Sequence, residues 1–414
     1  MFKNYLMTAY KVLMRRKFFS FVNLFGIALT LAVLTLVVAM LDNYLYPRGA
    51  EKNSGRFLEI TRLVLESEDG SSNWSDNPGY RFMQEYVLPM ESPEMITIYN
   101  SGVSGTSFVD GRKHELAMKR TDGNYWKILE FDFIEGGPLT DEDNQSGRFV
   151  AVINRQTRDE VFGDRSVVSE QIKVNGQTFE VIGVVENEAQ LSSHAYADVW
   201  VPISTDPSST YQSQMMSGFN ALLLASPGQE LAVIKEEYRA ALDSFEFEDP
   251  KQFAVAIGGA DTKLQSIARD STNDHRGYES GAGRFIGILV VGMFVFMLLP
   301  TINLVNLNTS RILERASEIG VRKAFGASSG NLVWQFITEN LVLTLIGGLI
   351  GYVLAIGLLD LIETSGLIKY AELQVNFRVF LASLLLIGFF GVLSGAWPAW
   401  RMSRMSAVDA LRGA

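Results

Sequence analysis

The sequence contains no cysteine among its 414 residues. This absence excludes disulfides, thiol nucleophiles and thiolate-held metal or iron–sulfur centres. The dipeptide Gly-Lys is also missing, so these residues hold no Walker A loop, G-x-x-x-x-G-K-[ST], to cradle nucleotide phosphates. Several long stretches also lack charged residues, and the prediction of the fold is based on this third absence.

Histidine is scarce, with only His114, His194 and His275. None has a partner at metal-ligand spacing, and Met118 stands where a zinc-protease helix beginning at His114 would need its second histidine. We expect all three histidines to be solvated. The acidic run 141–144 lacks the glycine of a calcium loop and is expected to be a solvated acidic turn. The sequence thus predicts no catalytic residue, no metal site and no cofactor site in this chain.

Four stretches are free of charge over the length that a membrane helix needs. They are residues 18–41, 285–308, 340–359 and 379–400. Each is at least as long as the ~20 residues with which a helix crosses ~30 Å of hydrocarbon. The first stretch is far longer than the apolar core of a signal peptide, so we expect an uncleaved anchor. The pattern predicts a membrane protein with four transmembrane α-helices.

Charge predicts the orientation of these helices. The amino-terminal flank, the connection 309–339 and the tail 401–414 carry 12 basic and four acidic residues, whereas residues 42–284 carry 22 basic and 39 acidic ones. Short basic loops stay in the cytoplasm, so both termini are expected inside, and the segments 42–284 and 360–378 outside. Residues 1–17 place apolar side chains at helical spacing, which predicts an amphipathic helix on the inner membrane surface. The strongly acidic outer segment repels nucleic acid.

The large segment between the first two spans mixes strand and helix patterns. Residues 56–65 alternate as a strand does, and residues 171–185 predict a β-hairpin around Asn175-Gly176, because Asn-Gly suits a type I′ turn. Helices are expected at 156–162 and 230–245. These patterns predict an α+β domain. We expect it to form two lobes, joined by the polar stretch 204–217.

The cytoplasmic connection has the pattern of two short helices around a corner. Glu314 and Glu318 lie at i and i+4, and Gly326 is placed to end the first helix, as glycine does just after a C-terminus. Apolar Ile319, Val321 and Phe325 stand among charged residues. An exposed apolar cluster with a charged rim is typical of a protein-docking surface.

Two spans contain paired glycines at G-x-x-x-G spacing. Gly347 and Gly351 lie in the third span, and Gly391 and Gly395 lie in the fourth. This spacing lets helix backbones approach closely. The glycines could pack the four helices of one chain or build a dimer interface, and the sequence leaves both open.

Four stretches of the sequence resemble one family, the MacB/FtsX-type ABC permeases. The cytoplasmic connection ERASEIGVRKAFGASSGNLVWQFITENLVLTLIGGLIG resembles the family's signature. The amino-terminal YKVLMRRKFFSFVNLFGIALT resembles its first span, and FVAVINRQTRDEVFGDRSVVSEQIKVNGQTFEVIGVVEN resembles its periplasmic core. The tail WPAWRMSRMSAVDALRG resembles its carboxy-terminal signature. The likeness covers most of the chain outside residues 204–283.

The resemblance implies a fold and a set of partners. The family fold has four transmembrane helices, with a large periplasmic domain between the first two. Two permeases pair as a homodimer or heterodimer in the membrane lipid, beside two cytoplasmic ABC ATPase subunits, and the loop between the second and third spans docks on the ATPase. By position, the resemblance assigns this coupling to Glu314, Glu318, Ile319, Gly320, Arg322, Lys323, Gly326 and Ala327.

The function that the resemblance implies is mechanotransmission in a bacterial inner membrane. A separate ATPase chain is expected to bind ATP and Mg, because this sequence begins directly at the membrane, so the permease itself is not an enzyme. Movement of the periplasmic domain is expected to drive efflux of a periplasmic substrate through an adaptor and an outer-membrane channel. Lipoprotein release and activation of a cell-wall hydrolase stay open within the family. A membrane-anchored sensor is the alternative of another class.

Overall fold

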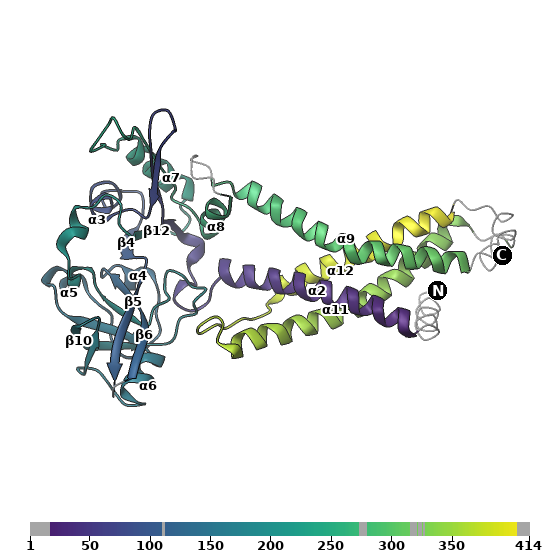
Figure 1. Ribbon diagram of the computed structural model, residues 1–414, viewed down its shortest axis with the longest axis horizontal. Helices are drawn as coiled ribbons and strands as arrows, with labels where there is room; N and C mark the ends of the chain where they lie inside the picture. The colour runs from purple at the N-terminus through teal and green to yellow at the C-terminus, as the bar shows by residue number, and fades with distance from the viewer. Residues whose placement is uncertain are drawn as a thin grey trace. The chain divides into compact units, whose positions relative to one another are not determined.

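The computed structural model describes residues 17–109, 112–272, 280–314, 321, 325 and 328–403. The chain divides into two compact units, both drawn in Figure 1. We call them the helical unit, within Met1–Asp42, Ile288–Leu367 and Leu373–Ala414, and the sheet unit, Asn43–Gly287 with Ile368–Glu372. The predicted amphipathic helix 1–17 lies outside the described residues except for Lys17.

In the described part of the helical unit there are four long helices: α2 (Lys17–Leu45), α9 (Ala282–Glu314), α11 (Ser329–Ser365) and α12 (Phe377–Ser403). Among the described residues, two helical segments are long and apolar enough to cross a membrane, Leu24–Leu45 and Asn340–Ser365. The apolar parts of the other two, Ala282–Leu298 and Phe377–Leu393, are shorter. A membrane-spanning role for α9 and α12 therefore stays a prediction.

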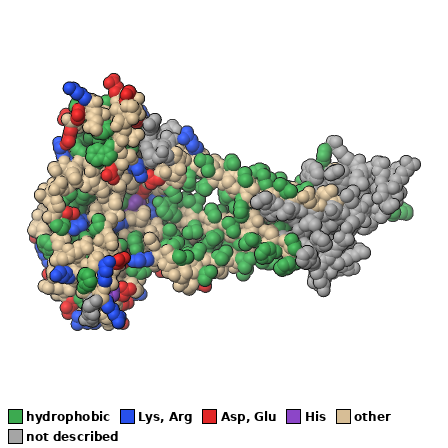
Figure 2. Space-filling view, in the orientation of Figure 1, with side chains coloured by type: hydrophobic (Ala, Val, Ile, Leu, Met, Phe, Trp, Pro, Cys, Tyr) green, Lys and Arg blue, Asp and Glu red, His purple; other side chains and the backbone are tan. Residues whose placement is uncertain are grey.

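Apolar side chains cover the outside of these helices. Phe21 of α2, Val291 of α9, Val353 of α11 and Leu385 of α12 are all exposed, and Figure 2 shows hydrophobic side chains gathered over the described part of the helical unit. A helix that is apolar all round is stable only when something other than water surrounds it. Lipid meets that need for the exposed faces.

Among its described residues, the sheet unit contains two sheets. The larger sheet has ten strands, in the order β1-β12-β4-β6-β11-β8-β10-β7, with β5 paired to β6 and β9 paired to β10. The smaller sheet has the order β13-β2-β3. Pairing is parallel between β6 and β11 and between β8 and β10, and it is antiparallel elsewhere. The strands are β1 (Phe57–Ile60), β2 (Leu63–Glu66), β3 (Asn73–Asp76), β4 (Met95–Asn100), β5 (Val103–Val109), β6 (Arg112–Thr121), β7 (Phe133–Gly136), β8 (Val150–Asn154), β9 (Gln171–Val174), β10 (Gln177–Val185), β11 (Val199–Pro202), β12 (Phe219–Leu224) and β13 (Val255–Gly258).

Short helices cover the sheets. They are α3 (Tyr80–Phe82) with the π-helical turn η3 (Met83–Val87), α4 (Tyr125–Ile128), α5 (Asp141–Ser146), α6 (Arg155–Phe162), α7 (Leu231–Asp243) and α8 (Lys263–Thr272), with 3-10 turns at Gly49–Glu51, Ser54–Arg56, Ile203–Thr205 and Ser209–Ser213. One apolar core joins β1, β4 and β12 to α7. Another surrounds the fully buried Trp200 of β11. The mixture of helices and strands agrees with the predicted α+β class.

Local sequence signals place several elements correctly. The hairpin β9–β10 turns at Asn175 and Gly176, whose φ angles are +49° and +82°. Positive φ at both positions is what a type I′ turn requires, and Asn-Gly adopts it at little cost. Helix α6 ends at Gly163, where φ is +72°. A glycine tolerates this conformation, which a side chain with a Cβ disfavours.

Three expectations need correction. The predicted strand 56–65 is two strands, because the chain breaks at Thr61 and Arg62 and enters the second sheet. Two lobes do not separate at 204–217, since β11 before this stretch and β12 after it belong to one sheet in one compact unit. The acidic run 141–144 begins the short helix α5, whose N-cap Thr140 forms a capping box with Asp143. Reciprocal hydrogen bonds there satisfy backbone donors that a free turn would leave to water.

Candidate functional site

The connection between α9 and α11 contains the residues that the sequence assigns to coupling. Glu314 is the last residue of α9, and α11 begins at Ser329. Val321 and Phe325 between them are described: the Phe325 N–H donates to the Val321 carbonyl at 3.0 Å, which is one helical turn. Their side chains are 46% and 89% exposed. Two apolar side chains are thus available at this connection.

The remaining residues of the predicted coupling set fall outside the described residues. They are Glu318, Ile319, Gly320, Arg322, Lys323, Gly326 and Ala327. Their roles stay predictions. Residues 326–330 also have the spacing G-x-S-x-G. Ser328 stands between two helices and not between a strand and a helix, so it lacks the setting of a nucleophile elbow.

The glycines of α11 lie against α2 in the helical unit. A Cβ added to Gly347 would meet Ile27 Cγ2 at 2.8 Å, and one added to Gly351 would meet the carbonyl oxygen of Ala28 at 2.5 Å. Side chains cannot approach a backbone oxygen so closely, so this part of α11 needs glycine for its contact with α2.

The glycines of α12 lie against α11. A Cβ on Gly391 would stand 2.9 Å from Leu341 Cδ1, and one on Gly395 would stand 3.0 Å from Asn340 Nδ2. All four glycines of the two pairs therefore make close approaches within one chain. A role in a dimer interface stays a prediction.

A buried ionisable cluster lies in the sheet unit. Glu51 is fully buried, and its Oε2 pairs with the ammonium of Lys263. Its Oε1 accepts the backbone N–H groups of His194, at 2.9 Å, and Ala195, at 2.8 Å. Burial acts to raise the pKa of Glu51, but Lys263 and His194 outweigh it and hold that pKa below its usual value. The carboxylate is therefore charged and bonded at both oxygens.

His194 is part of the same cluster, and the expectation of a solvated side chain was wrong for it. It is 5% exposed. Its Nε2 pairs with the carboxylate of Glu59, and its Nδ1 shares a hydrogen bond of 2.7 Å with the hydroxyl of Tyr99. A solvated setting fits His114 only in part, since it is half-buried and its Nδ1 lies 3.4 Å from Glu160. His275 lies outside the described residues.

Lys119 of β6 extends this cluster. Its ammonium donates to the carbonyl oxygens of Ser193 and His194, each at 2.6 Å. Burial lowers the pKa of Lys119 to about 7. Lys119 and the cluster side chains are almost wholly buried. Their hydrogen bonds hold segments distant in sequence together, and we assign them a structural role.

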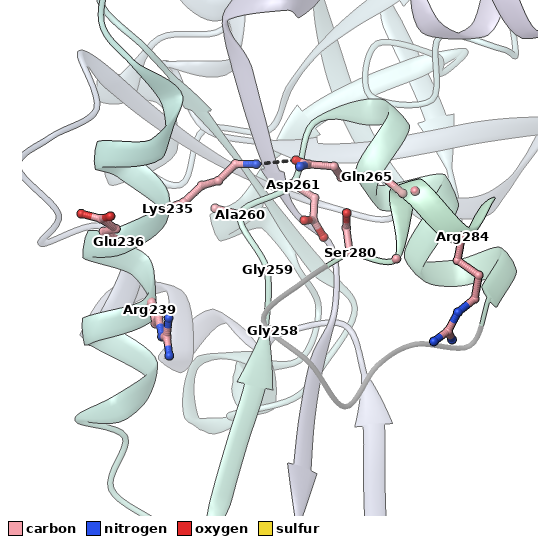
Figure 3. A pocket seen from close by; sticks show the side chains of 13 residues that line it. Lys235, Glu236, Arg239, Gly258, Gly259, Ala260, Asp261, Gln265, Ser280 and Arg284 are labelled. Atoms are coloured by element: carbon pink, nitrogen blue, oxygen red, sulfur yellow. Dashed lines mark hydrogen bonds between the residues drawn. The ribbon is translucent and has the colours of Figure 1, made fainter. Parts of the chain in front are cut away.

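One open depression of about 630 Å³ lies on the sheet unit beside α7 (Figure 3). Lys235, Glu236 and Arg239 of α7 line one side of it, and the end of β13 and Asp261 line another. Lys235 bonds Gln265, and Arg269 Nε lies 2.7 Å from Asp261. Asp261 is thus paired with Arg269, and Lys235 is engaged with Gln265, so these groups do not single out a ligand. Within the described residues, no group of three or more histidine, aspartate or glutamate side chains could hold a metal ion.

Comparison with known proteins identifies both units. The family model of the MacB-like periplasmic core domain matches residues 20–241, more than half of the chain. The model of the FtsX-like permease C-terminal domain matches residues 290–407. The second match includes the connection between α9 and α11.

Relatives support the same assignment. The uncharacterized ABC transporter permease YknZ of Bacillus subtilis is 27% identical over 317 residues, which cover 75% of this chain and 74% of that protein. The macrolide export ATP-binding/permease protein MacB of Chlorobaculum tepidum is 26% identical over 348 residues, which cover 80% of this chain and about half, 49%, of the relative.

A solved structure is similar at a lower level. The periplasmic region of MacB from Actinobacillus actinomycetemcomitans is 13% identical, with a TM-score of 0.37, and the match covers 54% of this chain and 95% of that one. A similarity this weak adds nothing to the family matches. From those matches, this membrane protein belongs to the MacB/FtsX-type ABC transporter permeases, with a MacB-like periplasmic core domain and an FtsX-like permease domain.

Proposed function

We propose that this permease transmits force from a separate cytoplasmic ABC ATPase to its sheet unit. The observation that carries the proposal is the 89% exposure of Phe325 in the connection between α9 and α11. A phenylalanine left in water forgoes the ~1.5–3 kcal/mol that burial provides. Docking into a partner's groove recovers that free energy. This connection is also where the family resemblance places the ATPase contact.

The charge pattern supports a cytoplasmic position for this connection. Its predicted basic flanks favour the inside, and the acidic sheet unit favours the outside. ATP binding is proposed to close the ATPase pair, displace the helices and move the sheet units of two paired permeases in a bacterial inner membrane. The chain itself then binds no nucleotide, in line with the missing Walker A loop.

Efflux is the proposed use of this movement. Support comes from relatives whose names describe export, of macrolides for the Chlorobaculum tepidum protein and of pyoverdine for one from Pseudomonas syringae. A periplasmic adaptor and an outer-membrane channel would complete the path. Lipoprotein release and hydrolase activation use the same moving parts, and a substrate screen with the assembled complex separates the three.

The test is the change Phe325→Asp in the full-length permease, with Phe108→Asp as the matched control. Phe108 of β5 is likewise exposed, at 69%, but lies in the sheet unit. Truncating an anchoring aromatic side chain costs about 2 kcal/mol or more, which is roughly 30-fold in affinity. We expect Phe325→Asp to weaken binding of the co-purifying ATPase by that factor and to abolish the stimulation of its ATPase activity. Phe108→Asp should change neither.

Two results would overturn the proposal. One is a wild-type permease that purifies without any ABC ATPase, or that binds ATP tightly by itself. The other is Phe325→Asp binding the ATPase as the wild type does. Light scattering of both variants in detergent checks that they remain folded and monodisperse.

A further inference from the structure

Five residues of the loop between α11 and α12 belong to the sheet unit. Helix α11 ends at Ser365 and α12 begins at Phe377, and both helices lie in the helical unit. The segment Ile368–Glu372 between them nevertheless packs as part of the sheet unit. The sequence predicted only a short outer loop, 360–378. We call Ile368–Glu372 the strap.

Backbone hydrogen bonds attach the strap to the loop before β11. The N–H of Gln190 donates to the carbonyl oxygen of Lys369 at 3.0 Å. In return, the N–H of Lys369 donates to the side-chain Oε1 of Gln190 at 3.1 Å. The backbone of Lys369 is therefore held by two hydrogen bonds to Gln190, one through its carbonyl oxygen and one through its N–H.

The second attachment is a buried carboxylate, Asp198, directly before β11. Asp198 is 1% exposed. The hydroxyl of Tyr370 donates to its Oδ1 at 2.8 Å, and the ammonium of Lys369 lies 3.6 Å from its Oδ2. From the sheet, Asn154 Nδ2 donates to Oδ1 at 3.1 Å and Ala117 N to Oδ2 at 2.8 Å. The strap therefore supplies two of the four partners of this charge.

Asp198 also connects the strap to the centre of the large sheet. Its backbone N–H donates to Ala117 of β6 at 2.7 Å, and its carbonyl accepts from the N–H of Asn154 of β8 at 3.1 Å. β11 pairs with both of these strands. Tyr370 is thus linked to three strands of the sheet through one charge-assisted hydrogen bond, a stronger kind than a hydrogen bond between neutral groups.

The backbone of the strap indicates that this contact is specific. Tyr370 has φ of +53°, and only Ser169 and Asn175 share a positive φ among the described non-glycine residues. A bulky residue holds this conformation only where its surroundings enforce it. Burial and the neighbouring Asp198 raise the pKa of Tyr370 above its usual value. Its hydroxyl therefore stays protonated and can donate. A loop that only lay on the surface would need neither the positive φ of Tyr370 nor a buried acceptor for its hydroxyl.

We propose that the strap is a coupling element, which carries movement of α11 and α12 to β11 of the sheet unit through Tyr370 and Asp198. The chain already joins α2 and α9 to the sheet unit covalently, and the strap adds a third attachment from the other two helices. This inference rests on the proposed function, since it names the route by which ATPase-driven movement of the helices reaches the sheet.

The experiment compares Tyr370→Phe with the matched control Tyr196→Phe in the full permease bound to its co-purifying ATPase. Tyr196 lies beside the strap, with its ring centroid 6.2 Å from that of Tyr370, and its hydroxyl forms no hydrogen bond with the residues that the structure describes. Both changes remove one hydroxyl. Only Tyr370→Phe removes a bond to Asp198.

Hydrogen–deuterium exchange reads the attachment and the coupling separately. Losing a hydrogen bond to a carboxylate weakens an attachment roughly tenfold or more. We expect the amides of Gln190 and Lys369 to exchange roughly tenfold faster in Tyr370→Phe and at the wild-type rate in Tyr196→Phe. A non-hydrolysable ATP analogue should change exchange over residues 190–202 in wild type and in Tyr196→Phe, and that response should be lost in Tyr370→Phe.

The outcomes distinguish the two proposals. If the analogue changes no exchange in the sheet unit of the wild-type complex, mechanotransmission itself fails. If wild type responds and Tyr370→Phe responds equally, the strap is not a coupling element, whether or not its amides have lost protection. If the amides of Tyr370→Phe stay protected, Tyr370 does not hold the strap.

Discussion

Replacing Lys263 with methionine tests the buried cluster that joins distant segments of the sheet unit. Methionine keeps most of the volume of lysine but removes the ammonium that pairs with Glu51. The cation also lies 5.4 Å from the centroid of the Tyr44 ring. The variant leaves Glu51 fully buried, with only the N–H groups of His194 and Ala195 on its other oxygen.

The expected cost is large because a buried charge loses its partner. Removing one member of a buried ion pair typically costs about 3–5 kcal/mol. For a unit of this size, each kcal/mol shifts the melting temperature by about 2–4 °C, so we expect a decrease of about 10 °C. The double variant Glu51→Gln/Lys263→Met should recover much of this loss, because the amide still accepts hydrogen bonds and carries no charge.

The pH dependence gives a second readout. In wild type, the pKa of Glu51 lies below its usual value because Lys263 and His194 outweigh its burial. The stability that this provides is present above the unfolded pKa of about 4.3 and is lost as the pH falls through the folded value. Without Lys263, we expect burial to dominate and to raise the pKa of Glu51. Protonation of Glu51 at low pH then removes the unpaired buried charge from the variant. The loss of stability relative to wild type should therefore be larger at pH 8 than at pH 5.

Thermal unfolding of the full chain in detergent measures both effects. The fluorescence of the buried Trp126 and Trp200 reports on the sheet unit. A deficit below about 1 kcal/mol, or one that is equal at pH 5 and pH 8, would refute the reasoning about the Glu51–Lys263 pair. So would a double variant that is as unstable as Lys263→Met alone.

Two further predictions concern the helical unit and its orientation. Gly351→Val places a Cβ 2.5 Å from the Ala28 carbonyl oxygen, so it should lower the free energy of unfolding by about 1–3 kcal/mol and lower the melting temperature measured by circular dichroism. The control Gly357→Val, with no neighbouring atom within 4 Å of its Cβ, should be as stable as wild type, and equal stability of the two variants would contradict close packing at Gly351. Single cysteines at Ser72 and Ser328, introduced into the cysteine-free chain, should differ in labelling by an impermeant maleimide in spheroplasts: Ser72→Cys should react and Ser328→Cys should not, and the reverse would reject the predicted orientation.

Local chemistry explains what the sequence predicted well. The hairpin β9–β10 follows from alternating burial in β9 and from the turn residues Asn175 and Gly176. Likewise, α6 ends where Gly163 adopts positive φ. Both signals lie within a few residues of the structure that they specify, so one sequence suffices to detect them. The family signature in the connection between α9 and α11 likewise lies within one short stretch of sequence.

Pairing between distant segments could not be predicted in this way. β1 pairs with β12, so that Phe57 lies opposite Leu224, and no turn signal connects segments so far apart. The break at Thr61 and Arg62 was missed because apolar residues continue on both sides of it while the two strands enter different sheets. The hydrophobic pattern of a sequence indicates which face of a strand is buried, but it does not indicate which neighbouring strand or helix covers that face.

The sequence by itself determined the apolar helices, the α+β class of the sheet unit and the family. Only the tertiary structure decided which polar side chains are buried and which groups they bond. His194 became buried because Glu59 and Tyr99, far from it in sequence, satisfy both of its ring nitrogens. In the same way, Tyr370 packs in the sheet unit because the carboxylate of Asp198 accepts a hydrogen bond from its hydroxyl. A polar side chain is buried only where the fold supplies its partners, and those partners are assembled by folding, not by neighbourhood in the chain.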